Sequence, residues 1–383
     1  MSKNNKVSIF ILIDALGWDY IKNKSFLDDV AETRTNLKTI LGYSSAAVPS
    51  ILSGKYPNEH GHWSYFYYSP ETSPFKWMKP ISRLPEVISE RLRTYIKKKT
   101  VKKSGYNGYF QIYAVPLKYL HFFDYCEKKD MWRQNGLNNA KSIFDYLYIN
   151  NIDYFLSTWP TPDKISVQTA LHNLEATTST NFYFLYLTEM DGLMHSHGTD
   201  SEVIDDKTEW YERQIRSIYE KANENFQEVD LYVFSDHGMT NTVKTFDLMG
   251  EIKKLHLQIP KDFIPFYDST MARFWFNSEN ARRMITDLLN SLEYGKILTE
   301  KELKELGVYF ENKQYGELIF LMNSGYLIVP SYMGKTAPKG MHGFHPDHKT
   351  SDGIFLSSNE IKRKLEHITD IFGVMINDVM STQ

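Results

Sequence analysis

The 383-residue sequence predicts an α/β fold in which a mostly parallel central sheet is flanked by helices. Short runs of strand-forming residues alternate with longer segments of helical spacing, and this alternation is typical of right-handed crossovers between parallel strands. Hydrophobic residues make up 42% of the chain, which is normal for a globular protein. The length suffices for one large core or two domains.

The elements of this core are expected in a regular order along the chain. The expected strands cover 7–13, 37–41, 153–158, 182–188 and 230–234. One helix is expected to start within LGWDYIKN (16–23). Further helices are expected at 46–54, 140–151, 163–176, 201–226 and 370–380.

Two segments change in character and are expected to be insertions in a single domain that spans residues 1–383. Segment 62–135 is dense in aromatic residues and includes a basic stretch, interpreted as a solvated helix face or loop, with a substrate-facing insertion as the alternative. Segment 245–335 is expected to form a cap. Its expected elements are a strand at 268–276, a helix at 278–292 with Ser278 as N-cap, and two short strands within 317–331, after which the core resumes at 340–356.

Composition excludes several classes of protein. The chain has 44 basic and 47 acidic residues, so we expect no binding to a nucleic-acid duplex and no polybasic membrane patch. The single cysteine, Cys126, excludes an intrachain disulfide. No secretory signal is evident and no apolar window is long enough to span a membrane, so a cytoplasmic location is expected. The oligomeric state is left open.

Polar side chains follow four of the strand-like runs. Ligands of open α/β sheets bind outside the carboxyl ends of the strands, so these side chains are expected to converge. They are Asp14 after VSIFILI, Ser44 after LKTILGY, Asp191 after FYFLYLTEM and Asp236 after LYVFS.

Three histidines are expected to join them. His195 lies four residues after Asp191, so on one helical turn both side chains would face the same ion, although an ordinary surface pair is the alternative for this spacing taken alone. His237 follows Asp236 directly, and His342 lies between two glycines. His197 competes with His195, and His345 and His348 compete with His342. Aspartates and histidines around a hydroxyl group suggest a two-metal site for phosphoryl chemistry.

The hydroxyl group would come from Ser44 or its neighbour Ser45. A serine needs a base or a metal to act as a nucleophile at neutral pH. No G-x-S-x-G sequence is present, so a hydrolase triad has no support. At the start of a helix a serine is often only an N-cap, but the free N–H groups there also bind phosphate oxygens.

Taken together, the motifs resemble those of the alkaline phosphatase superfamily, in its type I phosphodiesterase/nucleotide pyrophosphatase branch. Five motifs occur in the family's order and span residues 13–343: IDALGWDY, SILSGKYPNEHG, TEMDGLMHSHG, FSDHGM and GMHG. The resemblance implies an alkaline-phosphatase-like core. The sulfatase sequence Cys-x-Pro-x-Arg is absent, which argues against a formylglycine sulfatase.

The resemblance also implies a site for two divalent metal ions, most often zinc, with manganese as the alternative. One ion would be held by Asp191, His195 and His342. The other would be held by Asp14, Asp236 and His237 together with the nucleophile oxygen, and in-line attack on phosphorus would give a phosphoseryl intermediate.

The family's nucleophile lies ten residues before the glycine of a T-G or S-G pair, and counting back from Gly54 gives Ser44. Ser45 is the alternative after a one-residue slip. The proline that often follows the nucleophile in the family is missing here, and Pro49 comes later.

The first functional hypothesis is a metal-dependent phosphodiesterase or nucleotide pyrophosphatase that acts on a small phosphate ester or a nucleotide-like substrate. A phosphomonoesterase, phosphomutase or phosphotransferase of the same superfamily would share the motifs, and a non-catalytic metal-binding protein is a third hypothesis. The two insertions are expected to select the substrate. The aromatic run after the nucleophile helix would either stack on a base or pack against the core; its members are Trp63, Tyr65, Phe66 and Tyr67.

Overall fold

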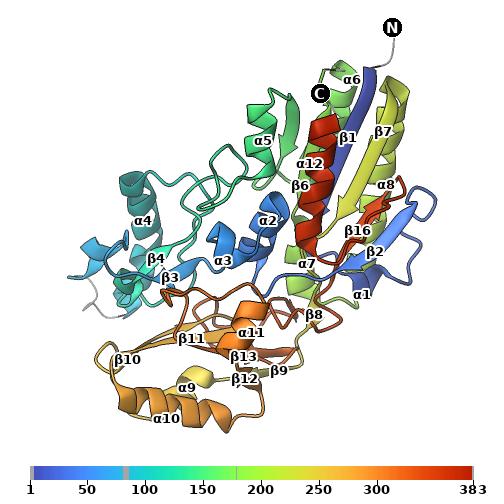
Figure 1. Cartoon of the computed structure of the whole chain (residues 1–383). Helices are drawn as coiled ribbons and strands as arrows, with labels where there is room; N and C mark the ends of the chain where they lie inside the picture. The colour runs from blue at the N-terminus through green and yellow to red at the C-terminus, as the bar shows by residue number, and fades with distance from the viewer. Residues whose placement is uncertain (1–3, 81–85, 178, 382–383) are drawn as a thin grey trace.

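The computed structural model, which describes residues 4–80, 86–177 and 179–381, has a six-stranded central sheet in the order β2-β16-β7-β1-β6-β5 (Figure 1). Residues 81–85 of the predicted insertion 62–135 lie outside the described residues. The strands are β1 (Asn4–Ile13), β2 (Thr33–Leu37), β5 (Tyr154–Ser157), β6 (Phe182–Leu187), β7 (Phe226–Phe234) and β16 (Gly353–Ser357). Neighbouring pairs among β5, β6, β1 and β7 are parallel, whereas β16 is antiparallel to both β7 and β2. The predicted mostly parallel sheet is therefore confirmed.

Helices cover both faces of this sheet. On one face lie α2, α5 and α12, and on the other lie α6, α7 and α8 (Figure 1). The α-helices are α1 (Trp18–Ile21), α2 (Ser44–Ser53), α3 (Pro57–His60), α4 (Glu86–Ser104), α5 (Ile143–Ile149), α6 (Asp163–Ala176), α7 (Glu189–His197), α8 (Glu202–Asn225), α9 (Leu248–Lys253), α10 (Glu279–Asn290), α11 (Glu300–Glu305) and α12 (Ile371–Ser381). Short 3₁₀ turns occur at η1 (Lys76–Met78), η3 (Leu120–Phe122) and η4 (Ile368–Asp370).

The period of two along the central strands divides their side chains between two cores. In β1, Phe10 and Leu12 enter the core beneath α2 and α12, whereas Ile9 and Ile11 enter the core beneath α6 and α8. Both faces of the strand are buried, which explains why β1 is a nearly continuous apolar run and not an alternating one. The same period places Asp14, at the end of β1, on the face of Phe10 and Leu12.

Segment 245–335 contains a second sheet of four antiparallel-paired strands in the order β10-β11-β13-β12. Ser278, at the start of α10, accepts a hydrogen bond from the N–H of Ala281, as predicted for an N-cap. The strands outside the central sheet are β3 (Phe66–Tyr68), β4 (Phe123–Tyr125), β8 (Thr240–Asn241), β9 (Lys244–Phe246), β10 (Phe263–Tyr267), β11 (Met271–Phe276), β12 (Gly295–Ile297), β13 (Leu318–Met322), β14 (Tyr326–Ile328) and β15 (Gly340–Met341).

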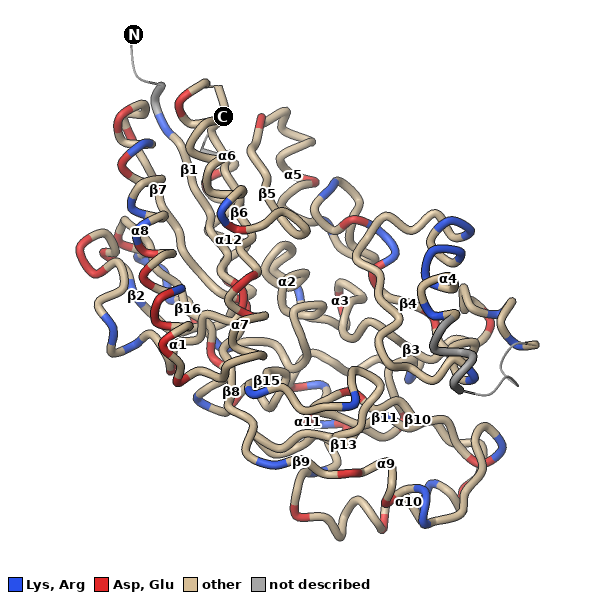
Figure 2. The backbone as a smooth tube through the Cα atoms, turned by 180° about the vertical axis from the view of Figure 1, so that it is seen from behind, with Lys and Arg blue, Asp and Glu red and all other residues tan. Residues whose placement is uncertain are grey.

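Segment 62–135 pairs β3 with β4 and carries α4 at its outer edge. The basic stretch of the sequence falls in α4, where Lys and Arg recur along the helix (Figure 2). The Nζ atom of Lys99 in this helix lies 4.2 Å from the centroid of the Trp77 ring. One cation of α4 therefore packs against an aromatic side chain of segment 62–135.

Two element predictions near the N-terminus were wrong in extent. The strand expected at 37–41 is β2, which lies at 33–37, because its pairing with β16 ends at the contact between Leu37 and Gly353. The helix expected within 16–23 is only the single turn α1. No helix among the described residues is long and apolar enough to cross a lipid bilayer.

Candidate metal centre

Two of the predicted ligands lie where neighbouring parallel strands of the central sheet end. Asp14 follows β1 and Asp236 follows β7 after one residue, and the two strands are in register with Leu12 opposite Phe234. Parallel strands end at the same edge, so both carboxylates are brought to one point. Both side chains are buried.

His237 completes the first group with these two aspartates. Its Nε2 lies 3.2 Å from Asp236 Oδ2 and 3.5 Å from Asp14 Oδ1. Its Nδ1 lies 3.0 Å from the carbonyl oxygen of Gly238, which can only accept, so Nδ1 carries the proton and donates. Nε2 is thereby left as the nitrogen that faces the carboxylates.

Asp191, His195 and His342 form the second group. Asp191 and His195 project from the same face of α7, and His195 Nε2 lies 3.2 Å from Asp191 Oδ1. His342 Nε2 approaches the same oxygen at 3.5 Å. His195 Nδ1 donates to the carbonyl oxygen of Gly340 at 2.8 Å, which again leaves Nε2 as the free nitrogen.

The two groups are adjacent. The ring of His237 in the first group stacks on that of His342 in the second, with centroids 3.8 Å apart and an interplanar angle of 11°. In each group one ligand atom from every residue lies within 4.8 Å of the others. The structure therefore brings together all six residues that the sequence analysis selected.

The two candidate nucleophiles differ sharply in their surroundings. Ser44 begins α2, and its Oγ lies 3.0 Å from His237 Nε2. Ser45 is buried, and its Oγ donates to the carbonyl oxygen of Trp63 at 3.2 Å. Ser44 does not directly follow a strand as the sequence analysis assumed, because β2 ends at Leu37; the first turn of α2 positions it instead.

Unsatisfied polar atoms show that the two groups fit metal ions. Among the buried atoms of the described residues without a hydrogen-bond partner, four belong to these groups: Asp14 Oδ1, Asp191 Oδ1, Asp236 Oδ2 and His342 Nδ1. Buried polar atoms are normally hydrogen-bonded. Here carboxylate oxygens face histidine lone pairs, and such facing acceptors need a cation between them. Three carboxylates and three imidazoles are a donor set that zinc accepts.

The pKa shifts of the three aspartates also favour a bound cation in these groups. Burial raises the pKa of Asp14 well above its ordinary value, and the neighbouring carboxylates of Asp236 and Asp191 raise it further. Burial likewise raises the pKa of Asp236. Burial opposes the ionisation of Asp191 too, but His195 and His342 outweigh it and lower the pKa of that carboxyl. Carboxylates crowded in this way are stabilised by a bound cation.

Both groups open into a cavity of about 660 Å³. Ser44, Asp14, Asp191, His195 and His342 line one part of it. The remaining wall comes largely from segment 62–135 and from the loop after β5, through Tyr65, Tyr109, Tyr113, Glu127, Trp132 and Trp159. A small molecule held in this cavity would therefore lie beside Ser44 and beside members of both groups.

The competing histidines lie outside the two groups. His197 is exposed on α7, His345 faces Asp347 at 3.6 Å, and His348 pairs with Thr350 at 2.8 Å. The aromatic run after the nucleophile helix is divided. Trp63 and Phe66 are buried in the core, as the packing alternative predicts, whereas Tyr65 lines the cavity.

Sequence reasoning missed Tyr186, whose hydroxyl group donates a short hydrogen bond to Asp14 Oδ2. The signal was present in the strand period: Tyr186 lies on β6 opposite Leu12 of β1, on the face that Asp14 shares. Glu127, Tyr109 and Tyr113, which also line the cavity, were missed as well. They come from irregular segments that carry no periodic signal.

Comparison with protein families gives one match. The model of the family described as type I phosphodiesterase/nucleotide pyrophosphatase matches residues 8–345, which include both groups and Ser44. No curated protein sequence matches the chain significantly.

Solved structures give the same fold at low sequence identity. Murine ectonucleotide pyrophosphatase/phosphodiesterase 5 has a TM-score of 0.67 and 15% identity, with 98% of this chain and 95% of that chain covered. The human protein of the same name has a TM-score of 0.68 and 13% identity over the same shares. An inactive variant of the murine protein, solved in complex with AMP, has a TM-score of 0.66 and 16% identity, again over 98% and 95%.

Proposed function

Because the chain belongs to the type I phosphodiesterase/nucleotide pyrophosphatase family, we propose that it hydrolyses phosphodiester or nucleotide pyrophosphate bonds with Ser44 as the nucleophile. The observation that carries the proposal is the position of Ser44 Oγ. It lies 3.0 Å from His237 Nε2, in a cavity that two groups of potential metal ligands share.

The metal ligands are proposed to be Asp191, His195 and His342 in one site and Asp14, Asp236 and His237 in the other. Zinc is the proposed metal, with manganese as the alternative, because both accept carboxylate and imidazole ligands. When bound, two such ions lower the pKa of a nearby hydroxyl group and offset the charge that develops on a phosphoryl group.

Ser44 is proposed to attack phosphorus in line with the leaving alcohol. Ser44 loses its hydroxyl proton to water, the bond from Oγ to phosphorus forms while the bond to the leaving oxygen breaks, and the leaving oxygen takes a proton from water to depart as the alcohol. Water then attacks the phosphoseryl group and regenerates the Ser44 hydroxyl group. Ser44 and Ser45 begin α2, and the backbone N–H groups of these two residues are proposed to bind the non-bridging oxygens, since those of Ala46 and Ala47 donate to the carbonyl oxygen of Tyr43. Tyr186 holds Asp14 in place throughout.

Segments 62–135 and 245–335 are proposed to act as insertions that shape the substrate site. Supporting this, the first supplies Tyr65, Tyr109 and Tyr113 to the cavity wall and the second supplies Asp268 and Met333. The murine relative solved with AMP supports a nucleotide-like compound as one substrate class.

A substrate panel with defined metals tests the proposal. The chelated protein is reconstituted with zinc or manganese and assayed on bis-p-nitrophenyl phosphate, p-nitrophenyl thymidine 5′-phosphate, p-nitrophenyl phosphate, a phosphonate and a dinucleotide pyrophosphate. We expect metal-dependent turnover with diesters or pyrophosphates preferred over the monoester by at least about tenfold in kcat/KM, a ratio that corresponds to about 1.4 kcal/mol. A preference for the monoester would favour a phosphomonoesterase instead, and bound metal without turnover of any compound would favour a non-catalytic metal-binding protein.

The ligand assignment is tested by metal content. Asp236→Asn is expected to lose one ion and most of the activity, because the buried Oδ2 has no other partner among the described residues. Asp347→Asn is the matched control, since this exposed carboxylate lies in neither group and pairs with Lys38. Two bound ions in Asp236→Asn would remove Asp236 from the ligand set.

A further inference from the structure

Tyr43 directly precedes Ser44, and the mechanism does not use its side chain, which is buried. Its backbone carbonyl oxygen accepts the N–H groups of Ala46 and Ala47 at 2.7 and 3.0 Å. Tyr43 therefore occupies the N-cap position of α2, but its side chain does not cap the helix. The hydroxyl group of Tyr43 has its partner in another part of the chain.

The partner of this hydroxyl group is Thr270, in the turn between β10 and β11. Tyr43 Oη lies 2.8 Å from Thr270 Oγ1 and accepts the N–H of Thr270 at 3.2 Å. Thr270 Oγ1 lies 3.0 Å from the carbonyl oxygen of Gly343, which can only accept, so the threonine hydroxyl group donates to Gly343. The Tyr43 hydroxyl group must then donate to Thr270 Oγ1. We call Tyr43, Thr270 and Gly343 the Tyr43 bridge.

The Tyr43 bridge joins the nucleophile to a proposed metal ligand. Ser44 directly follows Tyr43, and His342 directly precedes Gly343. The ring of Tyr43 also lies edge-on to that of His342, with centroids 5.6 Å apart and an interplanar angle of 80°. A Cβ at Gly343, whose φ is +86°, would lie 2.8 Å from Tyr43 Cε1, so the loop of His342 approaches this ring as closely as a glycine allows. Contacts within the bridge therefore act on both Ser44 and His342.

The turn that presents Thr270 is itself held in place. The N–H of Met322 in β13 donates to the carbonyl oxygen of Thr270 at 2.8 Å. At the start of the turn, the buried carboxylate of Asp268 forms an ion pair with Arg273 at 2.9 Å. Thr270 is fully buried, so water does not compete for its hydrogen bonds. Residues locked by packing and hydrogen bonds hold a site more precisely than mobile ones, so segment 245–335 provides Tyr43 with a rigid anchor.

We propose that Tyr43 is a positioning residue for the reaction, which fixes Ser44 and His342 relative to each other through the Tyr43 bridge. Segment 245–335 then contributes to turnover through Thr270 without supplying a reacting group. A displacement of about 1 Å between reacting atoms can lower a rate by about 100-fold, even when its cause lies away from those atoms. This inference rests on the proposed function, because Ser44 is taken as the attacking residue.

Three variants of the bridge test the inference on bis-p-nitrophenyl phosphate, with the activating metal at a saturating concentration. Tyr43→Phe and Thr270→Val each remove one hydroxyl group and nearly keep the shape of the side chain. We expect each to lower kcat at least about tenfold and to leave KM within about threefold of the parent, because the loss falls on the placement of Ser44 and not on substrate binding. Thr270→Ser keeps the hydroxyl group and is expected to retain kcat within about threefold. If Thr270→Val does not fold, Tyr43→Phe and Thr270→Ser decide the inference.

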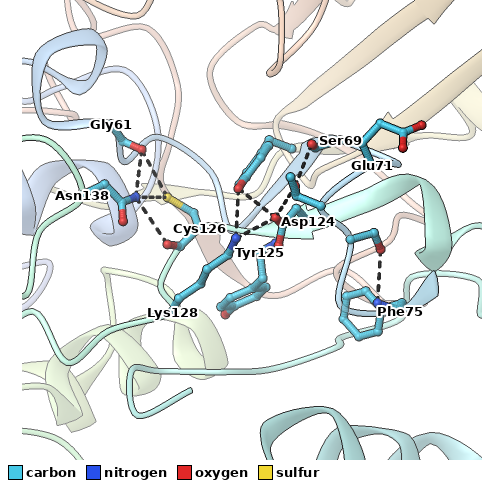
Figure 3. A network of polar contacts seen from close by, with 12 residues as sticks. Gly61, Ser69, Glu71, Phe75, Asp124, Tyr125, Cys126, Lys128 and Asn138 are labelled. Carbon is cyan, nitrogen blue, oxygen red and sulfur yellow. Dashed lines mark hydrogen bonds and ion pairs between the residues drawn. The ribbon is translucent and has the colours of Figure 1, made fainter. Parts of the chain in front are cut away.

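Tyr67→Phe is the matched control. The Tyr67 hydroxyl group donates to Asp124 Oδ2 at 3.1 Å, in a network to which Lys128 also donates at 2.6 Å (Figure 3), and Tyr67 does not line the cavity. We expect Tyr67→Phe and Tyr43→Phe both to unfold at a lower urea concentration than the parent, but only Tyr43→Phe to lose kcat. Unchanged kcat in Tyr43→Phe, or an equal loss of kcat in Tyr67→Phe, would mean that the bridge has a structural role alone and would overturn the inference.

Metal affinity separates the inference from the proposed function. Turnover by the parent with unchanged kcat in Tyr43→Phe would leave the proposed function standing, whereas no turnover of any diester by the parent would defeat it. In that case competition with a chromophoric chelator decides the inference. We expect Tyr43→Phe and Thr270→Val to weaken binding of one ion at least about tenfold, because His342 is no longer held in place, and Thr270→Ser and Tyr67→Phe to bind both ions as the parent does. Equal affinity in all five proteins overturns the inference, as does a parent that binds no ion.

Discussion

Ser44 and Ser45 are chemically identical neighbours whose hydroxyl groups have different hydrogen-bond partners. Ser44 Oγ faces His237, and Ser45 Oγ is hydrogen-bonded to the backbone of Trp63. We expect Ser44→Ala to lower kcat by about 10³-fold or more while metal content stays the same, since an attacking oxygen is lost without a change in the six proposed ligands. Stopped assays on bis-p-nitrophenyl phosphate and metal analysis of the same samples measure both quantities.

Ser45→Ala is the control for this pair. Its hydrogen bond is structural, so we expect activity within about threefold of the parent and a loss of about 1 kcal/mol in the free energy of unfolding. If Ser45→Ala were the inactive variant and Ser44→Ala the active one, the nucleophile assignment would move by one residue.

For single residues, the sequence was informative where the spacing between two side chains allows them to bind the same ion. The spacing of Asp191 and His195, and of Asp236 and His237, indicated possible ligands, and the resemblance carried by five ordered motifs selected the residues that the fold brings together. Glu127 gave no such signal. Its importance comes from burial without a partner, and burial in an irregular segment depends on contacts with chain far away in sequence.

The contact between β15 and α7 positions His195, one of the proposed ligands of the second group. Gly340 in β15 accepts the hydrogen bond that orients His195, and a Cβ at this position would lie 2.7 Å from the carbonyl oxygen of Met194 in α7. We expect Gly340→Ala to push β15 away from α7 and to weaken binding of one metal ion by about 10- to 100-fold, as happens when a partner of a ligating histidine is disturbed. Competition with a chromophoric chelator measures this affinity.

Gly334→Ala provides the comparison, because its Cβ would meet only the carbonyl oxygen of Thr336, at an ordinary 3.8 Å. This variant is expected to bind both ions with unchanged affinity. Equal metal affinity in Gly340→Ala and the parent would mean that the close approach of β15 does not control the site.

Helices with a strong hydrophobic period could be predicted from the sequence. Strands whose bounds depend on pairing with a distant strand could not. The apolar stripe of 163–176 corresponds to α6 over the same residues. By contrast, the strand expected at 37–41 lies at 33–37, since its bounds depend on β16, which comes from a distant part of the chain. β10 was missed because it is buried on both faces and contains Pro265, which weakens its resemblance to a strand.

For the whole molecule, Glu127 makes stability depend on pH. Burial raises its pKa from 4.5 to about 8, so the folded state holds this proton more tightly than the unfolded state does. Its contribution is therefore most favourable below about pH 4.5 and is lost as the pH rises toward 8, by an amount on the order of a few kcal/mol. Glu127→Gln removes this loss.

We therefore expect Glu127→Gln and the parent to unfold at similar urea concentrations at pH 4.5, and the variant to be the more stable protein at pH 8.5. Urea unfolding is followed by circular dichroism with metal chelated in both proteins, so that the metal groups contribute equally. A difference that is larger at the lower pH would contradict the sign of this effect.

The position of β16 also has a consequence for synthesis of the chain on the ribosome. Among the described residues, β2 pairs in the central sheet only with β16, and His342 lies eleven residues before the start of that strand. Synthesis proceeds at about 5–20 residues per second, so β16 leaves the ribosome on the order of tens of seconds after β2. During translation the nascent chain thus carries an incomplete sheet edge, and chaperone demand is expected to be highest in this interval.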